Sequence, residues 1–326
     1  MTAFTLLAIA QSGRLSYEAV LLLASLRARS PGFPGRVIFA EPQPGPLWQG
    51  DPRISDPAVR AFLIGNGAEI LPFESRHFGQ SYPYGNKIEA LAALPAGPFL
   101  FLDTDTLILS NLAAVAFDFA RPSASMRRTG TWPVIEAYGP GYSAIWKSLY
   151  DRFGLDFASS LDLSQPDEYW QRYLYFNAGW FFGADPYAFG ARFSTYATSI
   201  HSDRPEALEL QELNPWLDQI ALPLVIHSFG GTRPGPELSG MDGETTCHYR
   251  ALPLFYALES DAAVETLETI TAPNPVKKVL KAYAPFQRML YQGKGAEARA
   301  LFDRADLPPR AQSIRNRLKA EGLWLR

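Results

Sequence analysis

A pair of aspartates between two short apolar runs constrains the fold of this chain more than any other feature. Residues 99–102 read Phe-Leu-Phe-Leu, Asp103 and Asp105 follow, and residues 106–109 are again mostly apolar. An apolar run of strand length without a polar gap predicts a strand buried on both faces, as in a parallel sheet. Aspartates at its carboxyl end would project into the crevice where open α/β sheets bind ligands. Their oxygens suit Mg²⁺ or Mn²⁺, ions that usually bind together with phosphates. The alternative is a solvated turn, in which aspartate is a common residue.

The residues before this motif alternate between strand and helix patterns. We predict a strand, a helix, a strand, a helix and a strand over residues 4–10, 15–29, 37–40, 58–64 and 69–72. Alternation at this spacing predicts a doubly wound, mostly parallel α/β sheet. No Gly-x-Gly-x-x-Gly motif follows the first strand, and no phosphate-loop motif occurs in the chain. The sequence therefore carries neither the dinucleotide fingerprint nor the P-loop.

The last quarter of the chain differs from the rest in both pattern and charge. After Leu252 we predict four helices, over residues 263–270, 275–283, 295–303 and 311–321. Residues 276–326 carry 12 Lys and Arg against 4 Asp and Glu, a charge of +8, whereas the remaining residues carry 18 against 29 and stand at −11. We therefore predict a catalytic domain over residues 1–252 and a basic α-helical appendage over residues 253–326.

Composition favours a cytoplasmic protein. A single cysteine, Cys247, excludes an internal disulfide framework and agrees with a reducing compartment. The apolar amino terminus lacks a basic leader and fits a first strand better than a signal peptide, and no apolar run approaches the roughly 18 residues of a membrane span. The basic appendage is either a solvated face or a weak peripheral contact with the anionic inner face of a membrane. No basic-aromatic platform indicates nucleic-acid binding.

Four further residues carry reactive or polar groups at the ends of predicted elements. Lys87 lies in the first turns of a helix, where a lysine and a helix amino terminus together favour an anion. Asn177 begins an apolar strand that we predict over residues 176–183, so it is either a structural hydrogen bonder or a reader of sugar hydroxyls. Asp218 and Gln219 follow a proline at a helix start, where periodicity alone makes Asp218 a helix-dipole partner and Gln219 an exposed residue.

The order of these motifs resembles that of the glycogenin-like and lipopolysaccharide-glycosyltransferase family of retaining GT-A enzymes. Asp-Thr-Asp-Thr-Leu after an apolar strand, a lysine sixteen residues upstream, Phe-Asn-Ala-Gly and then Asp-Gln carry the resemblance over residues 2–250. It implies a nucleotide-sugar fold in which Asp103 and Asp105 hold Mn²⁺, or Mg²⁺, on the diphosphate of the donor. The resemblance further implies donor contacts for Gln11, Arg14 and Lys87, a place near the sugar for Asn177, and a position facing the donor sugar and the acceptor for Asp218 and Gln219.

The resemblance also implies a third metal ligand, a histidine from late in the fold, for which two residues compete. His227 keeps the family's His-x-x-Gly-x-x-basic-Pro spacing, yet it lies only nine residues after Asp218. A helix over residues 215–229 would place it in a last helical turn, where histidine complements the helix dipole. His248 lies instead in the β-rich segment 245–250, with room before it for a strand and a loop. We therefore prefer His248.

Together with the resemblance, these residues predict a metal-dependent glycosyltransferase that moves a sugar from a nucleoside-diphosphate sugar to a hydroxyl acceptor with retention. An aspartate-nucleophile phosphohydrolase also places Asp-x-Asp after an apolar strand, but here Thr106 comes one residue too early and no acidic metal pair is evident downstream. A nucleotidyltransferase would need a glycine-rich basic loop after the first strand, which is missing. The other alternative is an inactive nucleotide-sugar-fold binding protein, against which the intact Asp103, Asp105, Asn177 and Asp218 count.

Overall fold

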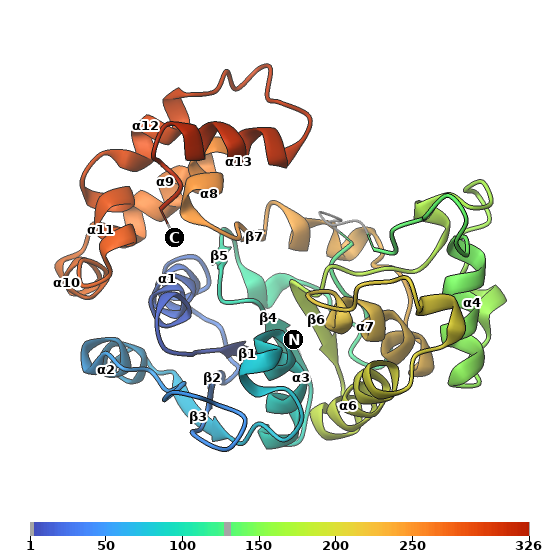
Figure 1. The fold of residues 1–326 in the computed structure, drawn as a ribbon. Coiled ribbons are helices and arrows are strands. Elements are labelled where there is room, and N and C mark those ends of the chain that lie inside the picture. Colours follow the sequence, from blue (N-terminus) through green and yellow to red (C-terminus); the bar gives the residue numbers. More distant parts are fainter. Residues whose placement is uncertain (1–2, 127–131, 326) are drawn as a thin grey trace.

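A five-stranded, mostly parallel sheet forms the centre of the molecule in the computed structural model, which describes residues 3–126 and 132–325 (Figure 1). Its spatial order is β3-β2-β1-β4-β6. The strands are β1 (Thr5–Ile9), β2 (Val37–Pro42), β3 (Glu69–Phe73), β4 (Phe99–Leu102) and β6 (Trp180–Gly183). The first four pair in parallel, and β6 runs antiparallel to β4. The predicted mostly parallel α/β sheet is therefore confirmed, with an antiparallel strand added at one edge.

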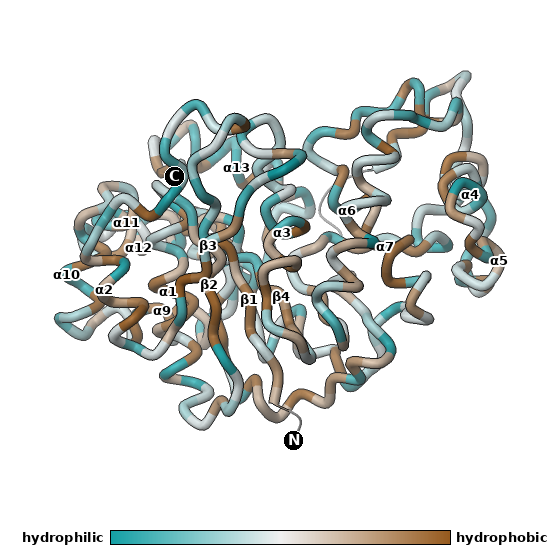
Figure 2. The backbone as a smooth tube through the Cα atoms, turned by 90° about the horizontal axis from the view of Figure 1, so that it is seen from below, coloured by the Kyte–Doolittle hydropathy of each residue, from teal (hydrophilic) through white to brown (hydrophobic). Residues whose placement is uncertain are grey.

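Alternate residues of each strand enter two apolar clusters, one on each face of the sheet. On β1, Leu6 and Ala8 belong to the first cluster, whereas Leu7 and Ile9 belong to the second. The first cluster includes residues of α1 (Arg14–Arg29) and α2 (Pro57–Gly65), and the second includes residues of α3 (Asn86–Glu89), α4 (Tyr142–Arg152), α6 (Pro186–Ser202) and α7 (Leu217–Ser228). Figure 2 shows the apolar strands at the centre of the molecule with helices on either side. Helices on both faces make the sheet doubly wound, as predicted.

A second, two-stranded sheet extends from the acidic turn that follows β4. Its strands are β5 (Thr106–Ile108) and β7 (Thr246–His248), which pair antiparallel with Thr106 opposite His248. The sequence indicates β structure in both segments, but not that the two segments pair with each other. This pairing carries a histidine from late in the chain to the carboxyl end of β4.

The prediction of the helices is less complete than that of the strands. It omits α4, α6 and three shorter helices, and it extends the helix at residues 274–280 three residues too far, to residue 283. Pro285 lies in the first turn of the next helix, where proline is tolerated, so the residues that follow form a separate helix. The remaining α-helices are α5 (Phe157–Ser160), α8 (Leu252–Leu258), α9 (Asp261–Thr271), α10 (Asn274–Leu280), α11 (Ala284–Tyr291), α12 (Lys294–Ala300) and α13 (Ala311–Ala320). Short 3₁₀ helices lie at Gly79–Ser81, Pro83–Gly85, Ala90–Ala93, Leu112–Ala114, Trp170–Arg172, Glu206–Leu208 and Pro236–Asp242.

Helices α9 and α10 of the C-terminal appendage pack against α1 (Figure 1). Tyr283 stacks on Tyr17 of α1 with ring centroids 5.0 Å apart, and Arg29 donates a hydrogen bond to Thr266 of α9 at 2.8 Å. The appendage is helical, as predicted, while a domain boundary at Leu252 stays a prediction. Within residues 3–126 and 132–325, no helix has both the length and the apolar character needed to cross a membrane.

Candidate active site

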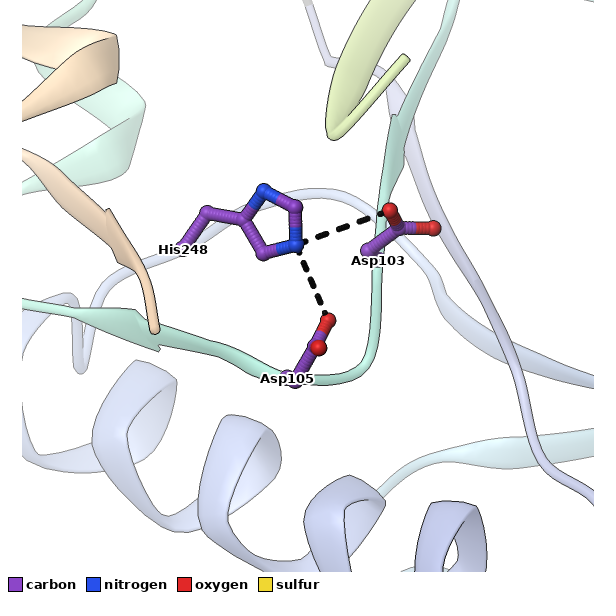
Figure 3. Close-up of side chains that lie close together, drawn as sticks. All are labelled: Asp103, Asp105 and His248. Atoms are coloured by element: carbon purple, nitrogen blue, oxygen red, sulfur yellow. Dashed lines mark ion pairs between the residues drawn. The ribbon is translucent and has the colours of Figure 1, made fainter. Parts of the chain in front are cut away.

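Asp103 and Asp105 lie where the chain leaves β4 and enters β5. The backbone N–H of Asp103 donates to the carbonyl of Gly179 at 2.8 Å, which holds the start of the turn against the neighbouring strand. The imidazole Nε2 of His248 lies 3.1 Å from Oδ1 of Asp105 and 3.7 Å from Oδ2 of Asp103 (Figure 3). The pairing of β5 with β7 thus brings His248 to face both carboxylates.

These three side chains fit a divalent cation. One ligand atom from each lies within 4.8 Å of the other two. Carboxylate oxygens suit Mg²⁺ and Mn²⁺, while an imidazole is a ligand typical of transition ions, so the set fits Mn²⁺ better than Mg²⁺. In the part of the chain that the structure describes, no second group of three such side chains comes together.

Burial and opposite charge compete in setting the ionisation of this cluster. Burial raises the pKa of Asp103 above its usual value, against the effect of the neighbouring Lys87. Burial also acts to raise the pKa of Asp105, but the charge of His248 and its hydrogen bond outweigh burial, so this pKa is lowered. Burial lowers the pKa of His248, but Asp105 and Asp103 outweigh it, so this pKa is raised. The two carboxylates therefore favour positive charge between them.

Lys87 is the buried link between the aspartate turn and α7. Its side chain is 7% exposed, and its Nζ lies 2.9 Å from Oδ1 of Asp103 and 3.2 Å from Oδ2 of Asp218. The same ammonium donates to the carbonyl of Ala178 at 3.1 Å. Burial acts to lower the pKa of Lys87, but the two aspartates raise it above its usual value. Lys87 therefore stays charged and holds both carboxylates in place.

Asp218 is a buried member of this network rather than a helix-dipole partner at the surface. Its residue is 2% exposed, and its Oδ1 accepts a hydrogen bond from the hydroxyl of Tyr82 at 2.7 Å. The backbone N–H of Asp218 donates back to the same hydroxyl at 2.9 Å. The next residue, Gln219, accepts a hydrogen bond from the hydroxyl of Tyr175 through its Oε1. The start of α7 is thereby tied to two tyrosines from other parts of the chain.

The segment Asn177–Gly179 forms a turn and not the first residues of the predicted strand. Ala178 has a φ of 57°, in the left-handed region, which breaks the extended conformation before β6 begins at Trp180. The side-chain oxygen of Asn177 accepts from the N–H of Gly179 at 2.8 Å, so this amide has a structural role. A Cβ at Gly179 would lie 2.4 Å from Nδ1 of His248. Only glycine therefore leaves room for the histidine here.

The cluster lies between two adjoining cavities. One, of about 290 Å³, contains Asp218, Gln219 and Trp216 beside the three candidate metal ligands. The other, of about 270 Å³, is mostly apolar and is lined by Ile9 and Phe101 at the ends of β1 and β4. Both cavities share Arg14, Tyr84, Lys87, Asp103 and Asp105. A larger cavity of about 700 Å³, beside β3 and α6, contains none of the predicted site residues.

Most of the predicted site residues meet in the first of these cavities. The predicted residues that line it are Arg14, Lys87, Asp103, Asp105, Asn177, Asp218, Gln219 and His248. Gln11 is not among its lining residues and instead accepts a hydrogen bond from Asn86 at 3.0 Å, so its predicted donor contact stays a prediction. His227 lies in the last turn of α7, with its Nε2 3.2 Å from the hydroxyl of Ser159 and its ring against Tyr150.

Sequence reasoning missed several residues of the site. They are Tyr82, Tyr84, Trp216, Arg250, Arg315 and Trp324. The first four adjoin motifs already singled out, so proximity in the sequence is a signal for them. No comparable signal exists for Arg315 and Trp324, which reach the cavity only through tertiary packing.

Solved structures and one family model are similar to this chain. A crystal structure of the galactosyltransferase LgtC in complex with donor and acceptor sugar analogs is 15% identical, with a TM-score of 0.42 over 71% of this chain and 73% of that chain. The structure of an active-site mutant of LgtC is 15% identical, with a TM-score of 0.40 over 68% and 70%. No curated protein matches the chain. The family model described as "Rhodobacterales glycosyltransferase domain" matches residues 6–230, which contain both aspartates and Asp218. This chain therefore belongs to the Rhodobacterales glycosyltransferase family.

Proposed function

We propose that this glycosyltransferase moves a sugar from a nucleoside-diphosphate sugar to a hydroxyl acceptor, with retention of configuration, in the manner of GT-A enzymes. Asp103, Asp105 and His248 would hold the divalent cation, Mn²⁺ or Mg²⁺. The observation that carries the proposal is the convergence of these three ligands, within 4.8 Å of one another, between two cavities. A metal-bound diphosphate at this point would send its nucleoside into one cavity and its sugar into the other.

The two cavities differ in the way that this orientation requires. The cavity with Ile9 and Phe101 is mostly apolar and favours the flat face of a base. The cavity with Asp218, Gln219 and Asn177 offers the polar groups that sugar hydroxyls require. We therefore place the donor sugar and the acceptor in this cavity of about 290 Å³, which we call the sugar-side cavity.

The transfer would need few groups from the protein. The oxygen of the acceptor hydroxyl bonds to the anomeric carbon while the bond from that carbon to the diphosphate breaks. The electron pair of the broken bond stays on the diphosphate. The diphosphate also takes the proton of the hydroxyl. A bound cation would supply neutralisation of the departing diphosphate. Asp218 would stabilise the positive charge that develops on the sugar, and Lys87 and Tyr82 would keep its carboxylate oriented. Lys87 would also keep Asp103 oriented toward the metal site.

Membership of a glycosyltransferase family sets aside the phosphohydrolase alternative. The donor and the acceptor are still to be identified. A thermal-shift panel with UDP-, GDP-, CDP- and ADP-sugars, each with Mn²⁺ and with EDTA, is the direct test for the donor. A ligand at 100 times its Kd stabilises a protein by about 2.7 kcal/mol. We expect sugars of one base to raise the melting temperature with Mn²⁺ and not with EDTA. No response to any of them would contradict the proposal.

We also retain, as a proposal, a cytoplasmic location with weak peripheral contact at an anionic membrane. Exposed basic residues on the last helices support it, among them Lys278, Lys281, Arg288 and Lys319. Leu323 is buried and Trp324 is half-buried, so attachment would depend on charge more than on insertion. Each basic side chain near an anionic surface contributes about 1 kcal/mol. We expect the protein to co-sediment with anionic vesicles at low salt and to be released by several hundred millimolar salt. No sedimentation at low salt would indicate that the basic residues form only a solvated face.

A further inference from the structure

One wall of the sugar-side cavity comes from the far end of the chain. Arg315 of α13 and Trp324, shortly after it, line the same cavity as Asp103, Asp105 and His248. Helix α13 lies over α8, the helix that follows β7, as Figure 1 shows. The last helix of the appendage is thus placed beside the metal cluster.

Apolar packing holds this wall in position. Ile314 and Leu318 are fully buried, and Leu323 is 4% exposed. Residues four apart lie on one face of a helix, so Ile314 and Leu318 anchor α13 through its inner face. Arg315 directly follows the first of these anchors, at the margin of that face. Its backbone is therefore fixed, while its side chain reaches the cavity.

Arg315 has an unsatisfied donor at this position. Its Nε is buried and has no hydrogen-bond partner within residues 3–126 and 132–325. Buried polar groups are normally hydrogen-bonded, because an unpaired donor costs free energy. Arg317 on the same helix is exposed and lies 3.2 Å from Glu321, so it has an ordinary surface partner. The two arginines differ in that only Arg315 lines the cavity.

The charges around the cavity leave a place for an anion of two charges beside a bound cation. The basic side chains are Arg14, Lys87, Arg250 and Arg315, and the acidic ones, including the partner of Arg14, are Glu18, Asp103, Asp105 and Asp218. These eight groups balance one another. A divalent cation adds two positive charges, and the diphosphate of a nucleotide sugar carries two negative charges. With Glu18 counted the loaded pocket is neutral, whereas its lining residues alone carry one more positive than negative charge.

Arg250 is placed to work with Arg315. It follows His248 by two residues and has a φ of 64°, a left-handed conformation that non-glycine residues rarely adopt and that is concentrated at functional sites. Its carbonyl accepts a hydrogen bond from Arg14 at 2.9 Å, which fixes this unusual backbone. A guanidinium presents planar paired donors that match phosphate oxygens. Two such groups lie in one cavity with the candidate metal ligands.

We propose that α13 is part of the active site and that Arg315, together with Arg250, binds the donor diphosphate at the phosphate next to the sugar. This inference rests on the proposed function. During transfer, Arg315 would stabilise the negative charge that the departing diphosphate gains. Trp324 would cover the same side of the pocket. The predicted boundary at Leu252 would then separate two parts of the chain without separating the site.

The test measures binding of UDP, GDP, CDP and ADP by titration calorimetry in the presence of Mn²⁺, followed by the monophosphate of the preferred base. Arg315→Gln should weaken the preferred diphosphate by about 10-fold to 100-fold, the range of a charge-assisted hydrogen bond, and should leave the monophosphate within about twofold. Arg317→Gln removes the same charge from the same helix and should bind as the unaltered protein does. Arg315→Lys keeps the charge and the packed stem, so its diphosphate affinity should lie between those of Arg315→Gln and Arg317→Gln.

Each outcome of this experiment has one meaning. Equal diphosphate affinity in Arg315→Gln and Arg317→Gln would overturn the inference while leaving the proposed function standing. An equal loss for diphosphate and monophosphate in both Arg315 variants would also overturn it, because it would indicate a general disturbance of the pocket. If the unaltered protein binds none of the four diphosphates with Mn²⁺, the proposed function fails and the inference fails with it.

Discussion

The two walls of the sugar-side cavity are built on different physical principles. On the sheet side, Lys87 is 7% exposed and ties Asp103 to Asp218, so charged groups are paired and held before any ligand enters. On the α13 side, Arg315 is half-buried and keeps an unpaired donor on a helix that apolar residues anchor. The first wall is preorganised, whereas in our proposal the buried donor of the second is paired when the diphosphate binds. We therefore expect loss of a metal ligand on the sheet side to weaken binding of both the metal and the nucleotide sugar, and changes on the α13 side to weaken nucleotide binding without changing metal affinity.

The largest effect should follow loss of a metal-binding carboxylate. Asp103→Asn and Asp105→Asn should each weaken Mn²⁺-dependent nucleotide-sugar binding by more than about 100-fold, because even residues that only orient a ligand cost 10- to 100-fold. Thermal shift with and without Mn²⁺ measures this loss. Asp151→Asn, at a surface pair with Lys147, is the matched control. Unchanged diphosphate affinity in both variants would contradict a metal site at Asp103 and Asp105.

Replacing each candidate histidine with alanine should give the next largest difference in Mn²⁺ affinity. His248→Ala should weaken Mn²⁺ binding about 10-fold to 100-fold, because an imidazole beside both carboxylates is lost. His227→Ala should leave metal affinity unchanged, since it removes only the contacts with Ser159 and Tyr150. Calorimetric titration with MnCl₂ ranks the two variants. The opposite ranking would show that the wrong histidine has been chosen.

Gly179→Ala should reproduce part of the loss of Mn²⁺ affinity expected for His248→Ala without changing any candidate metal ligand. The added Cβ would lie 2.4 Å from Nδ1 of His248 and 3.0 Å from Oδ1 of Asn177, so the imidazole must shift. We expect metal affinity to fall by about tenfold, less than in His248→Ala. Gly65→Ala, whose Cβ meets nothing within 4 Å, controls for the loss of a glycine. Wild-type metal affinity in Gly179→Ala would mean that this close approach does not position the histidine.

Tyr82→Phe should separate chemistry from binding on the sheet side. The hydroxyl makes hydrogen bonds to the carboxylate and the backbone of Asp218, so its loss leaves a buried carboxylate less well oriented. A buried hydrogen bond to a charged group contributes about 1.5–3 kcal/mol, and we expect kcat to fall about tenfold. The KM for the donor should stay within about twofold. A change confined to KM would assign Asp218 to donor binding instead.

The smallest effect should come from Trp324 on the α13 side. Trp324→Leu removes an aromatic surface from the wall of the cavity and should reduce nucleotide-sugar affinity by about two- to fivefold, corresponding to about 0.5–1 kcal/mol. Tyr138→Leu, a fully exposed aromatic residue, controls for a general loss of aromatic surface. A fall in Mn²⁺ affinity of the same size would show that the two walls are not independent.

The parts of the fold that sequence predicts are those fixed by local pattern. The strands β1 to β4 and the helices α1 and α2 follow from apolar runs and breakers, and the aspartates follow from the rule that ligands gather at strand ends. The pairing of β5 with β7 depends on tertiary contacts, so the sequence favours His248 over His227 without establishing which of them approaches the aspartates. The extended conformation predicted for residues 176–179 fails because Ala178 is left-handed in a buried network. The place of Arg315 depends wholly on how α13 packs.

The central claim is that Asp103, Asp105 and His248 form one cation site at the donor pocket. Titration of the protein with Mn²⁺, with free Mn²⁺ followed by electron paramagnetic resonance, tests it most directly. We predict one bound Mn²⁺ per chain, tighter in the presence of the preferred nucleoside diphosphate, and its loss in Asp103→Asn and Asp105→Asn but not in Asp151→Asn. Full Mn²⁺ stoichiometry and affinity in both site variants would contradict the claim.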